Sequence, residues 1–276
     1  MDQEIARQKH EVLVSILKKI RSLVVAFSGG VDSSYLLAVA HDILKEKVIA
    51  ATAESMIHPL KEIEEAGNFA HNRDIRHIVF KSTEMEIHDF VKNGPDRCFH
   101  CKQQMARALF AIAAKEGIKH VAHGANVDDL SDYRPGFKAA QKAGMIAPLI
   151  DAGLAKDEIR FLSRNLGLST WDRPQMACLA SRIPYGSTIT EEKLMMIDQA
   201  ENFLLEQGLK EVRVRHHESV ARIEAPGQEV EKLVSGKLKH AVVEEFHRIG
   251  FNHIAVDLEG YVPGKMNRDL EKRQEI

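Results

Sequence analysis

The sequence predicts an α/β protein, with a parallel-sheet domain over residues 1–180 and a smaller α+β domain over residues 187–276. Over the first ~170 residues, short apolar runs alternate with stretches of helical periodicity, which is typical of a parallel sheet with helical crossovers. Beyond about residue 187 the pattern changes to one long helix followed by paired, alternating strands. A chain of 276 residues with 44% hydrophobic residues can form one large or two ordinary domains.

The elements of the first domain follow in order along the chain. The N-terminal segment MDQEIARQKHEVLVSILKKI has the pattern of an amphipathic helix. Apolar runs predict strands over residues 23–27, 48–52, 77–80 and 119–123, and helical patterns cover residues 33–45, 60–71, 85–90 and 102–116. Because parallel strands end at one edge of their sheet, the loops that follow them are expected to hold the ligand.

The second domain begins with the helical segment TEEKLMMIDQAENFLLEQG, for which Thr190 is a plausible N-cap and Gly208 a stop signal. EVRVRHH and VARIEA alternate like paired strands, and two short helices and a strand over residues 253–258 follow. Arg213 and Arg215 are two residues apart on a strand, so both face one side, as a pair that binds a substrate phosphate would. The alternative is a pair of solvated charges on the outer face of the strand.

Composition excludes several classes of protein. Thirty-eight Lys and Arg residues against 40 Asp and Glu residues give a net charge of −2, which offers no broad attraction for nucleic acid or for a membrane surface. No apolar run approaches the ~18–20 residues of a membrane span, and the N-terminus lacks the apolar core of a signal peptide. Three cysteines are too few for a disulfide framework, so we expect a cytoplasmic protein with reduced thiols.

The segment FSGGVDSSYLL, residues 27–37, lies where the first strand meets the first crossover helix. A glycine loop before a helix start lets backbone N–H groups approach an anion, so this junction predicts a phosphate site. Ala53, Glu54 and Ser55 follow the second strand, and GANVDDLSDYRPG, residues 124–136, follows the fourth. Three loops are therefore expected to meet at one site. The plainer alternative is a glycine turn in which Asp32 caps the helix.

The second group of interest is the cysteines. Cys98 and Cys101 form a CxxC pair, and Cys178 lies in WDRPQMACLASRIPYG. Such a pair spaces two thiolates for one metal or cluster, and a remote thiolate can complete a tripod. A structural zinc would require a fourth ligand, such as His100. The alternative is three unrelated reduced thiols.

The glycine loop is not of the Walker type, because no Gly-Lys-Ser/Thr follows it. It resembles the SGGxDS loop of the ATP pyrophosphatase (PP-loop) superfamily, in which the loop holds the pyrophosphate part of ATP while a substrate oxygen attacks the α-phosphorus. The resemblance implies ATP and Mg²⁺ as cofactors. By this resemblance the phosphates are held by Ser28, Gly29, Gly30, Asp32, Ser33 and Ser34, and the expected Mg²⁺ ligands are Asp32, Asp128 and Asp129, with Asp32 also catalytic. The positions that follow the strands add the expected ATP contacts Ala53, Glu54, Ser55, Gly124, Asn126 and Arg134.

Four segments, SGGVDSS, GANVDDLSDYRPG, RPQMACLASRIPYG and VRVRHHESVARIE, make the chain similar to the sulfur transferase LarE family, which helps to build the nickel-pincer nucleotide cofactor of lactate racemase. The resemblance implies that carboxylates of a small pyridinium mononucleotide are adenylated and then attacked by sulfur, which gives thiocarboxylates. Cys178 matches the sulfur-bearing position, which in single-cysteine members gives up its own sulfur and becomes dehydroalanine. Cys98 and Cys101 instead resemble those of three-cysteine members, which implies a [4Fe-4S] cluster on Cys98, Cys101 and Cys178.

The resemblance also implies further site residues and a homo-oligomer. Ser181, Arg182, Arg213 and Arg215 would bind the substrate, and Glu201, Glu224 and Glu231 match positions that can gather a metal. Other interpretations stay open. Ser181 and Arg182 could have a structural role in their loop, and Arg134 could hold its own loop in shape through Asp132.

Three other functions would share some of these features. A tRNA-thiolating enzyme would have the same loop and cluster but would require a basic RNA surface, which the charge balance does not indicate. An amidating synthetase would have no use for the CxxC pair. A nucleotide-binding sensor would bind ATP without releasing pyrophosphate, and it would leave Cys178 unexplained.

Overall fold

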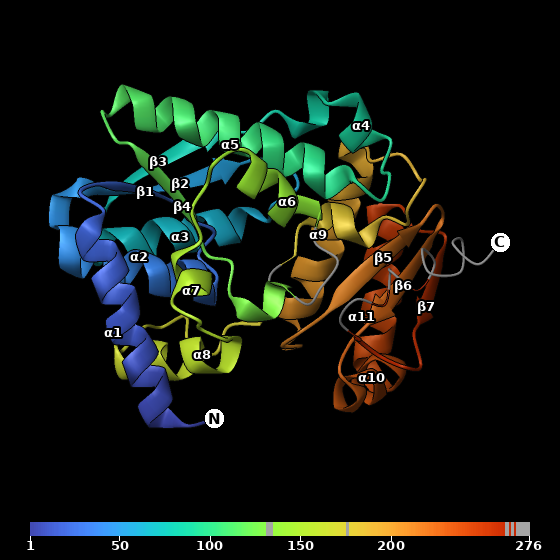
Figure 1. Ribbon diagram of the computed structural model, residues 1–276. Helices are drawn as coiled ribbons and strands as arrows, with labels where there is room; N and C mark the ends of the chain where they lie inside the picture. The colour runs from blue at the N-terminus through green and yellow to red at the C-terminus, as the bar shows by residue number, and fades with distance from the viewer. Residues whose placement is uncertain (131–134, 175–176, 263–264, 266–267, 269–276) are drawn as a thin grey trace. The chain divides into compact units, whose positions relative to one another are not determined.

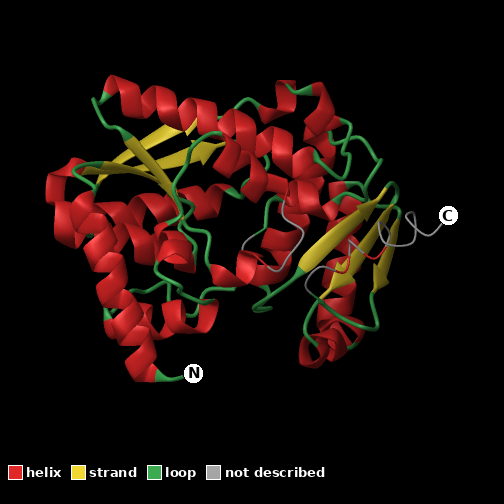
Figure 2. Cartoon of the chain, viewed as in Figure 1, coloured by secondary structure: helices red, strands yellow, loops and turns green. Residues whose placement is uncertain are grey.

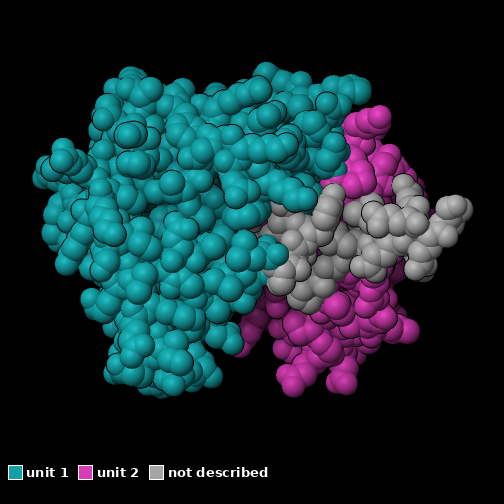
Figure 3. Space-filling model, in the orientation of Figure 1, with its two compact units in different colours: residues 1–90, 96–176 teal, residues 91–95, 177–276 magenta. Residues whose placement is uncertain are grey.

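The computed structural model describes residues 1–130, 135–174, 177–262, 265 and 268; Figures 1 and 2 show the arrangement of the elements within each part. The chain forms two compact units, one of residues 1–90 and 96–176 and the other of residues 91–95 and 177–276 (Figure 3). The sequence pattern gave no sign that residues 91–95 belong to the second unit. The exact predicted boundaries, 1–180 and 187–276, stay a prediction.

A four-stranded parallel sheet forms the centre of the first unit. It consists of β1 (Leu23–Ala26), β2 (Val48–Glu54), β3 (Arg76–Lys81) and β4 (His120–His123), in the order β3-β2-β1-β4. Leu23 of β1 pairs in register with Val48 on one side and His120 on the other. All four strands lie where the apolar runs predicted them, and the predicted α/β fold class is confirmed.

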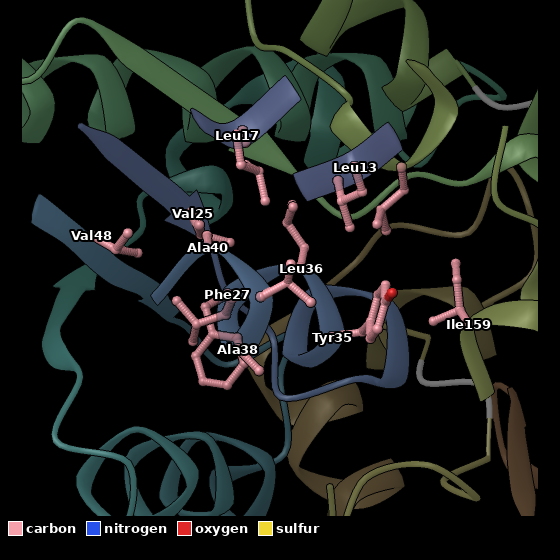
Figure 4. Close-up of a cluster of buried hydrophobic side chains, with 14 of the residues drawn as sticks. Leu13, Leu17, Val25, Phe27, Tyr35, Leu36, Ala38, Ala40, Val48 and Ile159 are labelled. Carbon is pink, nitrogen blue, oxygen red and sulfur yellow. The ribbon is translucent and has the colours of Figure 1, made fainter. Parts of the chain in front are cut away.

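Helices cover both faces of this sheet. Leu23, Val25 and Phe27 pack with α1 (Gln3–Lys19), α2 (Val31–Leu44), α3 (Leu60–His71), α7 (Pro148–Asp151) and α8 (Lys156–Asn165), and Figure 4 shows part of this core. Val24, Ile49 and Val121 pack on the opposite face, against α5 (Arg97–Lys115) and α6 (Pro135–Lys142). Because neighbouring residues of a strand point to opposite faces, a strand covered on both sides is apolar throughout, as the central strand β1 (LVVA) is here.

Two helices differ from their predicted bounds. The stretch 85–90 forms a 3₁₀ turn over Glu84–Glu86 and the short helix α4 (His88–Val91) instead of one helix. Helix α5 begins at Arg97, five residues before the predicted start at Lys102, so the CxxC pair lies in its first two turns. Cysteine has only a weak intrinsic preference for helix, which is why the pattern did not reveal the extra turn.

The second unit contains a three-stranded mixed sheet, in the order β5 (Arg213–His217), β6 (Val220–Glu224), β7 (His253–Val256). Strands β5 and β6 are antiparallel, whereas β7 runs parallel to β6. One face packs on α9 (Glu191–Glu206), α10 (Gly227–Val234) and α11 (Gly236–Ile249) through Val214, Ala221 and Ile223. Thr190 caps α9 as predicted, since its Oγ1 accepts a hydrogen bond from the Lys193 N–H at 3.2 Å.

A helix that crosses a membrane needs both length and apolar character, and none of the helices in the described residues combines the two.

Candidate functional site

The glycine loop lies at the point in the sheet where the strand order reverses. Strand β1 has β2 on one side and β4 on the other, and the residues that leave its carboxyl end are Phe27, Ser28, Gly29 and Gly30. In open α/β sheets, ligands bind at this kind of switch point. The φ of Gly29 is +75°, and a Cβ there would lie 3.3 Å from the Cβ of Ala66, so glycine is required both for its backbone conformation and for close packing.

The hydroxyl groups of the loop bond to one another and to the loop backbone. Ser28 Oγ and Ser33 Oγ lie 3.1 Å apart, and Ser33 Oγ donates to the Gly30 carbonyl at 3.2 Å. Ser34 is fully buried in the first turn of α2. No side chain caps this helix at Gly30, and Asp32 lies inside the first turn instead of at the cap. The interpretation of Asp32 as the helix cap is therefore wrong.

Asp32 has a lysine partner that the sequence gave no reason to expect. Lys156 Nζ, at the start of α8, donates to Asp32 Oδ2 at 2.7 Å. The other oxygen, Oδ1, is buried and makes no hydrogen bond within the described part of the chain. Burial raises the pKa of Asp32 above its ordinary value, the nearby Lys156 opposes this rise and the negative charge of Asp129 adds to it.

The loop after β4 packs directly on the glycine loop. A Cβ on Gly124 would lie 2.8 Å from the backbone nitrogen of Ser33, closer than real Cβ atoms approach. The Asn126 N–H donates to Asp129 Oδ2 at 3.0 Å, and Asn126 Oδ1 accepts from the Asp128 N–H at 2.9 Å. These bonds hold the loop in shape beside the first turn of α2. Arg134, predicted to bind ATP, lies outside the described residues.

The three predicted magnesium ligands differ in what their carboxylates already contact. Asp128 Oδ2 accepts from the Lys156 N–H at 2.8 Å, and Asp129 Oδ2 is bonded to Asn126. Within the described residues, no three His, Cys, Asp or Glu side chains gather as a metal site. The buried Oδ1 of Asp32 is the atom that best fits a hard cation held jointly with phosphate oxygens.

The loop after β2 contains Ser55, with Ala53 and Glu54 as the last residues of the strand. Ser55 Oγ donates to Glu84, and so does Ser82 Oγ. Glu84 is buried, with 1% of its surface exposed. This shared carboxylate fixes Ser55 at the same carboxyl edge of the sheet as the glycine loop.

Sequence reasoning missed a second cation at the glycine loop. Arg173 Nη1 donates to the Gly29 carbonyl at 3.0 Å, and its Nη2 lies 2.9 Å from Glu65. Arg160 in turn donates to the Arg173 carbonyl at 2.7 Å. Lys156 belongs to no recognisable motif, and Arg173 opens the segment RPQMACLASRIPYG, where nothing indicated a contact with the glycine loop. Both lie more than 120 residues from their partners in the loop, so no local pattern could have placed them there.

The cysteines are divided between the two units. Cys98 and Cys101, three residues apart at the start of α5, lie on the same side of that helix in the first unit. Cys178, in the second unit, is the N-cap of the 3₁₀ turn Leu179–Arg182. None of the three forms a disulfide bond within the described residues, and Cys98 is exposed while the other two are partly buried.

Arg182, predicted to bind substrate, is buried and has several partners within the second unit. Its Nε and Nη2 each lie 2.9 Å from a carboxylate oxygen of Glu201. Its Nη1 donates to the carbonyls of Ala177 and Cys178, and to Ser181 Oγ at 3.0 Å. The predicted metal ligand Glu201 is therefore paired with an arginine.

Arg213 and Arg215 lie on the face of the second sheet opposite to α9. Both are buried, so the interpretation of the pair as solvated charges is wrong. Arg215 bonds to Glu224, which is fully buried, and Arg213 stacks over the Tyr261 ring at 4.9 Å. Glu231, the third predicted metal residue of this unit, is exposed on α10.

Comparison with known proteins identifies relatives that span nearly the whole chain. Residues 1–131 match the model of the PP-loop domain. An uncharacterized protein of Synechocystis is 38% identical over 264 residues, 96% of this chain and 98% of that protein. The pyridinium-3,5-bisthiocarboxylic acid mononucleotide synthase of Lactiplantibacillus plantarum is 33% identical over 268 residues, 96% of each chain. An uncharacterized protein of Methanocaldococcus jannaschii is 26% identical over 243 residues, 88% of this chain and 92% of that protein.

Proposed function

Because the chain belongs to the LarE family of ATP-dependent sulfurtransferases, we propose that it converts both carboxylates of pyridinium-3,5-biscarboxylic acid mononucleotide into thiocarboxylates. The product is the precursor of a nickel-pincer nucleotide cofactor. The observation that carries the ATP-dependent half of the proposal is the glycine loop at the sheet's switch point, with Asp32 and Lys156 paired beside it.

The first step forms an acyl adenylate. A carboxylate oxygen of the substrate attacks the α-phosphorus of ATP, and the bond from that phosphorus to the bridging oxygen breaks, releasing pyrophosphate. The backbone of Ser28, Gly29 and Gly30 would hold the pyrophosphate part, with Ser33 and Ser34 in the first turn of α2. Lys156 supports this role because it brings a positive charge next to the loop, where charge develops on the leaving group.

The remaining predicted ATP contacts stay proposals. Ala53, Glu54 and Ser55 end or follow β2, and Gly124 and Asn126 follow β4, so all five belong to loops at the carboxyl edge of the sheet. Asp32 Oδ1 would contribute a ligand to Mg²⁺ bound to the phosphates, which neutralises their charge. Asp128 and Asp129 are better suited to holding the loop and the start of α8, because their carboxylates accept hydrogen bonds from the backbone N–H groups of Lys156 and Asn126.

The second step transfers sulfur. A sulfur nucleophile attacks the acyl carbon, the bond from carbon to the adenylate oxygen breaks, and AMP leaves with the bonding electrons. We propose that Cys178 either carries this sulfur or holds its source. Ser181 and Arg213 are the residues proposed to bind the mononucleotide, whereas Arg182 and Arg215 are already engaged with Glu201 and Glu224.

Cys98, Cys101 and Cys178 supply the donor chemistry that a [4Fe-4S] cluster requires, since all three are cysteines outside any disulfide bond and two of them lie on one side of a helix. A cluster with three cysteine ligands leaves one iron open to an exchangeable sulfur ligand. Cys98 and Cys101 would anchor the cluster from α5. Because Cys98 is exposed, sulfide could reach the cluster from solution. We further propose that the enzyme is cytoplasmic and forms a homo-oligomer.

Anaerobic reconstitution tests the route of the sulfur. The protein is incubated with iron and sulfide, and both elements are then quantified per chain, with Cys98→Ala, Cys101→Ala and Cys178→Ala as variants. Thiocarboxylate is measured by mass spectrometry after ATP and the mononucleotide are added. A four-iron cluster that is lost in each variant, together with several products per chain, supports the cluster route.

Two other outcomes would redirect the proposal. If no cluster forms and Cys178 loses the mass of H₂S in one turnover, the sulfur comes from that residue, which becomes dehydroalanine. If pyrophosphate is released only when tRNA is supplied, the function is tRNA thiolation instead. In both cases binding of ATP to the glycine loop is expected to remain.

A further inference from the structure

The backbone segment that carries Cys178 is held by two arginine side chains. Arg182 Nη1 donates to the Ala177 carbonyl at 2.6 Å and to the Cys178 carbonyl at 3.1 Å. Arg215 Nη1 donates to the Ser181 carbonyl at 3.0 Å. The 3₁₀ turn itself adds the bond from the Ser181 N–H to the Cys178 carbonyl, at 2.9 Å. The segment lies outside any longer helix or strand, so side chains supply much of what fixes it.

Each of these arginines is held in turn by a buried glutamate. Arg182 makes a two-bond pair with Glu201, whose Oε1 also accepts from the Val214 N–H of β5 at 2.8 Å. Arg215 donates from Nε and Nη2 to Glu224 Oε2, at 3.0 and 2.6 Å. None of these four residues has more than 7% of its surface exposed. The two pairs therefore link the segment rigidly to α9, β5 and β6.

The planar guanidinium group explains why arginine is used twice. Its five N–H donors lie in one fixed plane, so a carboxylate can occupy one edge while other donors reach backbone carbonyls. A lysine ammonium has three donors and no such plane, so it cannot serve both sets of acceptors in the same directions. Arg182 and Arg215 thus act as rigid spacers between a glutamate and the cysteine segment.

We propose that Arg182, Glu201, Arg215 and Glu224 form a carbonyl clamp that positions Cys178 for sulfur transfer. This inference rests on the proposed role of Cys178, and it holds whether that residue gives up its own sulfur or holds a cluster. It assigns Arg182 to positioning instead of substrate binding, and Glu201 to anchoring Arg182 instead of binding a metal. Attack on an acyl carbon needs the reacting atoms about 3–3.5 Å apart, and a misplacement of about 1 Å costs about 10²-fold in rate.

The test separates sulfur transfer from adenylation. Arg182→Lys is compared with wild type in single-turnover reactions, in which the release of pyrophosphate and the formation of thiocarboxylate are both timed. We expect thiocarboxylate formation to slow by about 10²-fold, while the first release of pyrophosphate stays within about twofold. Equal slowing of both steps, or no slowing of either, would overturn the clamp.

Arg222→Lys is the matched control. Arg222 lies on the same face of the sheet and is paired with Glu224 and Asp257, but its described hydrogen bonds and ion pairs do not include the cysteine segment. Its replacement is expected to leave both steps within about twofold. Should Arg182→Lys fail to fold, Glu201→Gln carries the test, because it keeps the volume of the side chain and removes the charge and one of the two acceptor oxygens that hold Arg182.

A second readout does not depend on the activity. In a Cys98→Ala/Cys101→Ala background, the only remaining thiol is Cys178, and its rate of alkylation by iodoacetamide reports how firmly its segment is held. We expect Arg182→Lys to raise this rate by at least about threefold over the Arg222→Lys control, because local opening becomes easier. An unchanged alkylation rate would overturn the clamp, whether or not the wild-type enzyme forms thiocarboxylate. A wild-type enzyme that forms no thiocarboxylate would count against the proposed function instead.

Discussion

Replacing Gly124 with alanine tests whether the loop after β4 and the glycine loop work as one site. The new Cβ would lie 2.8 Å from the Ser33 nitrogen, 3.0 Å from the Ser33 Cα and 3.1 Å from the Asp32 carbonyl carbon. All three are backbone atoms in the first turn of α2, so no flexible side chain can move aside. The strand end or the helix start must shift instead.

The magnitude follows from the size of the overlap. Carbon and nitrogen atoms attract best at about 3.5–4.0 Å, so the Cβ would intrude by several tenths of an ångström on each of three atoms. Overpacking of this kind typically costs about 1–3 kcal/mol. Since the atoms displaced belong to Asp32 and Ser33, we expect the affinity for ATP to fall at least about tenfold, which corresponds to ~1.4 kcal/mol.

Isothermal titration with a nonhydrolysable ATP analogue measures this effect, and urea denaturation measures the change in stability. Gly67→Ala is the control, because Gly67 lies inside α3 of the same unit and a Cβ there would meet only His77 Nδ1, at 3.9 Å. It should bind ATP normally and be more stable by about 0.5–1 kcal/mol. If Gly124→Ala bound ATP as tightly as this control, the two loops would not form a common ATP site.

Two further predictions concern charges of the first unit. Lys156→Gln leaves Asp32 without its counterion, so we expect the KM for ATP, measured by pyrophosphate release, to rise about tenfold. Lys156→Arg keeps the charge and should bring the KM most of the way back to the wild-type value. Equal KM values in all three proteins would refute the role of the charge. Burial, with a smaller effect of Lys102, lowers the pKa of His123 to about 4, below the ordinary 6.5. The unfolded chain therefore binds more protons than the folded one between these values, and His123 contributes stability above pH 6.5 that is lost as the pH falls towards 4. Urea denaturation at pH 7 and pH 4.5 should show that His123→Asn removes about 2–3 kcal/mol of this pH dependence, and an unchanged difference between the two pH values would contradict the burial of a neutral imidazole.

The sequence predicted the architecture well where local pattern and tertiary structure agree. The four apolar runs became the parallel strands, because the middle of each strand is packed by helices and requires apolar side chains. The second unit formed its predicted N-cap at Thr190 and its paired strands. The start of α5 was placed too late, since the residues around Cys98 carry little helical preference of their own.

For the site, the sequence by itself determined the groups whose chemistry is carried by one short segment. The glycine loop and the CxxC pair could be recognised, because the backbone freedom of Gly29 and the spacing of two thiols are local properties. Only the tertiary structure decided which charged groups form ion pairs. Lys156 meets Asp32 across 124 residues, and Glu201 meets Arg182 across 19, because packed elements bring them together and buried charges require partners.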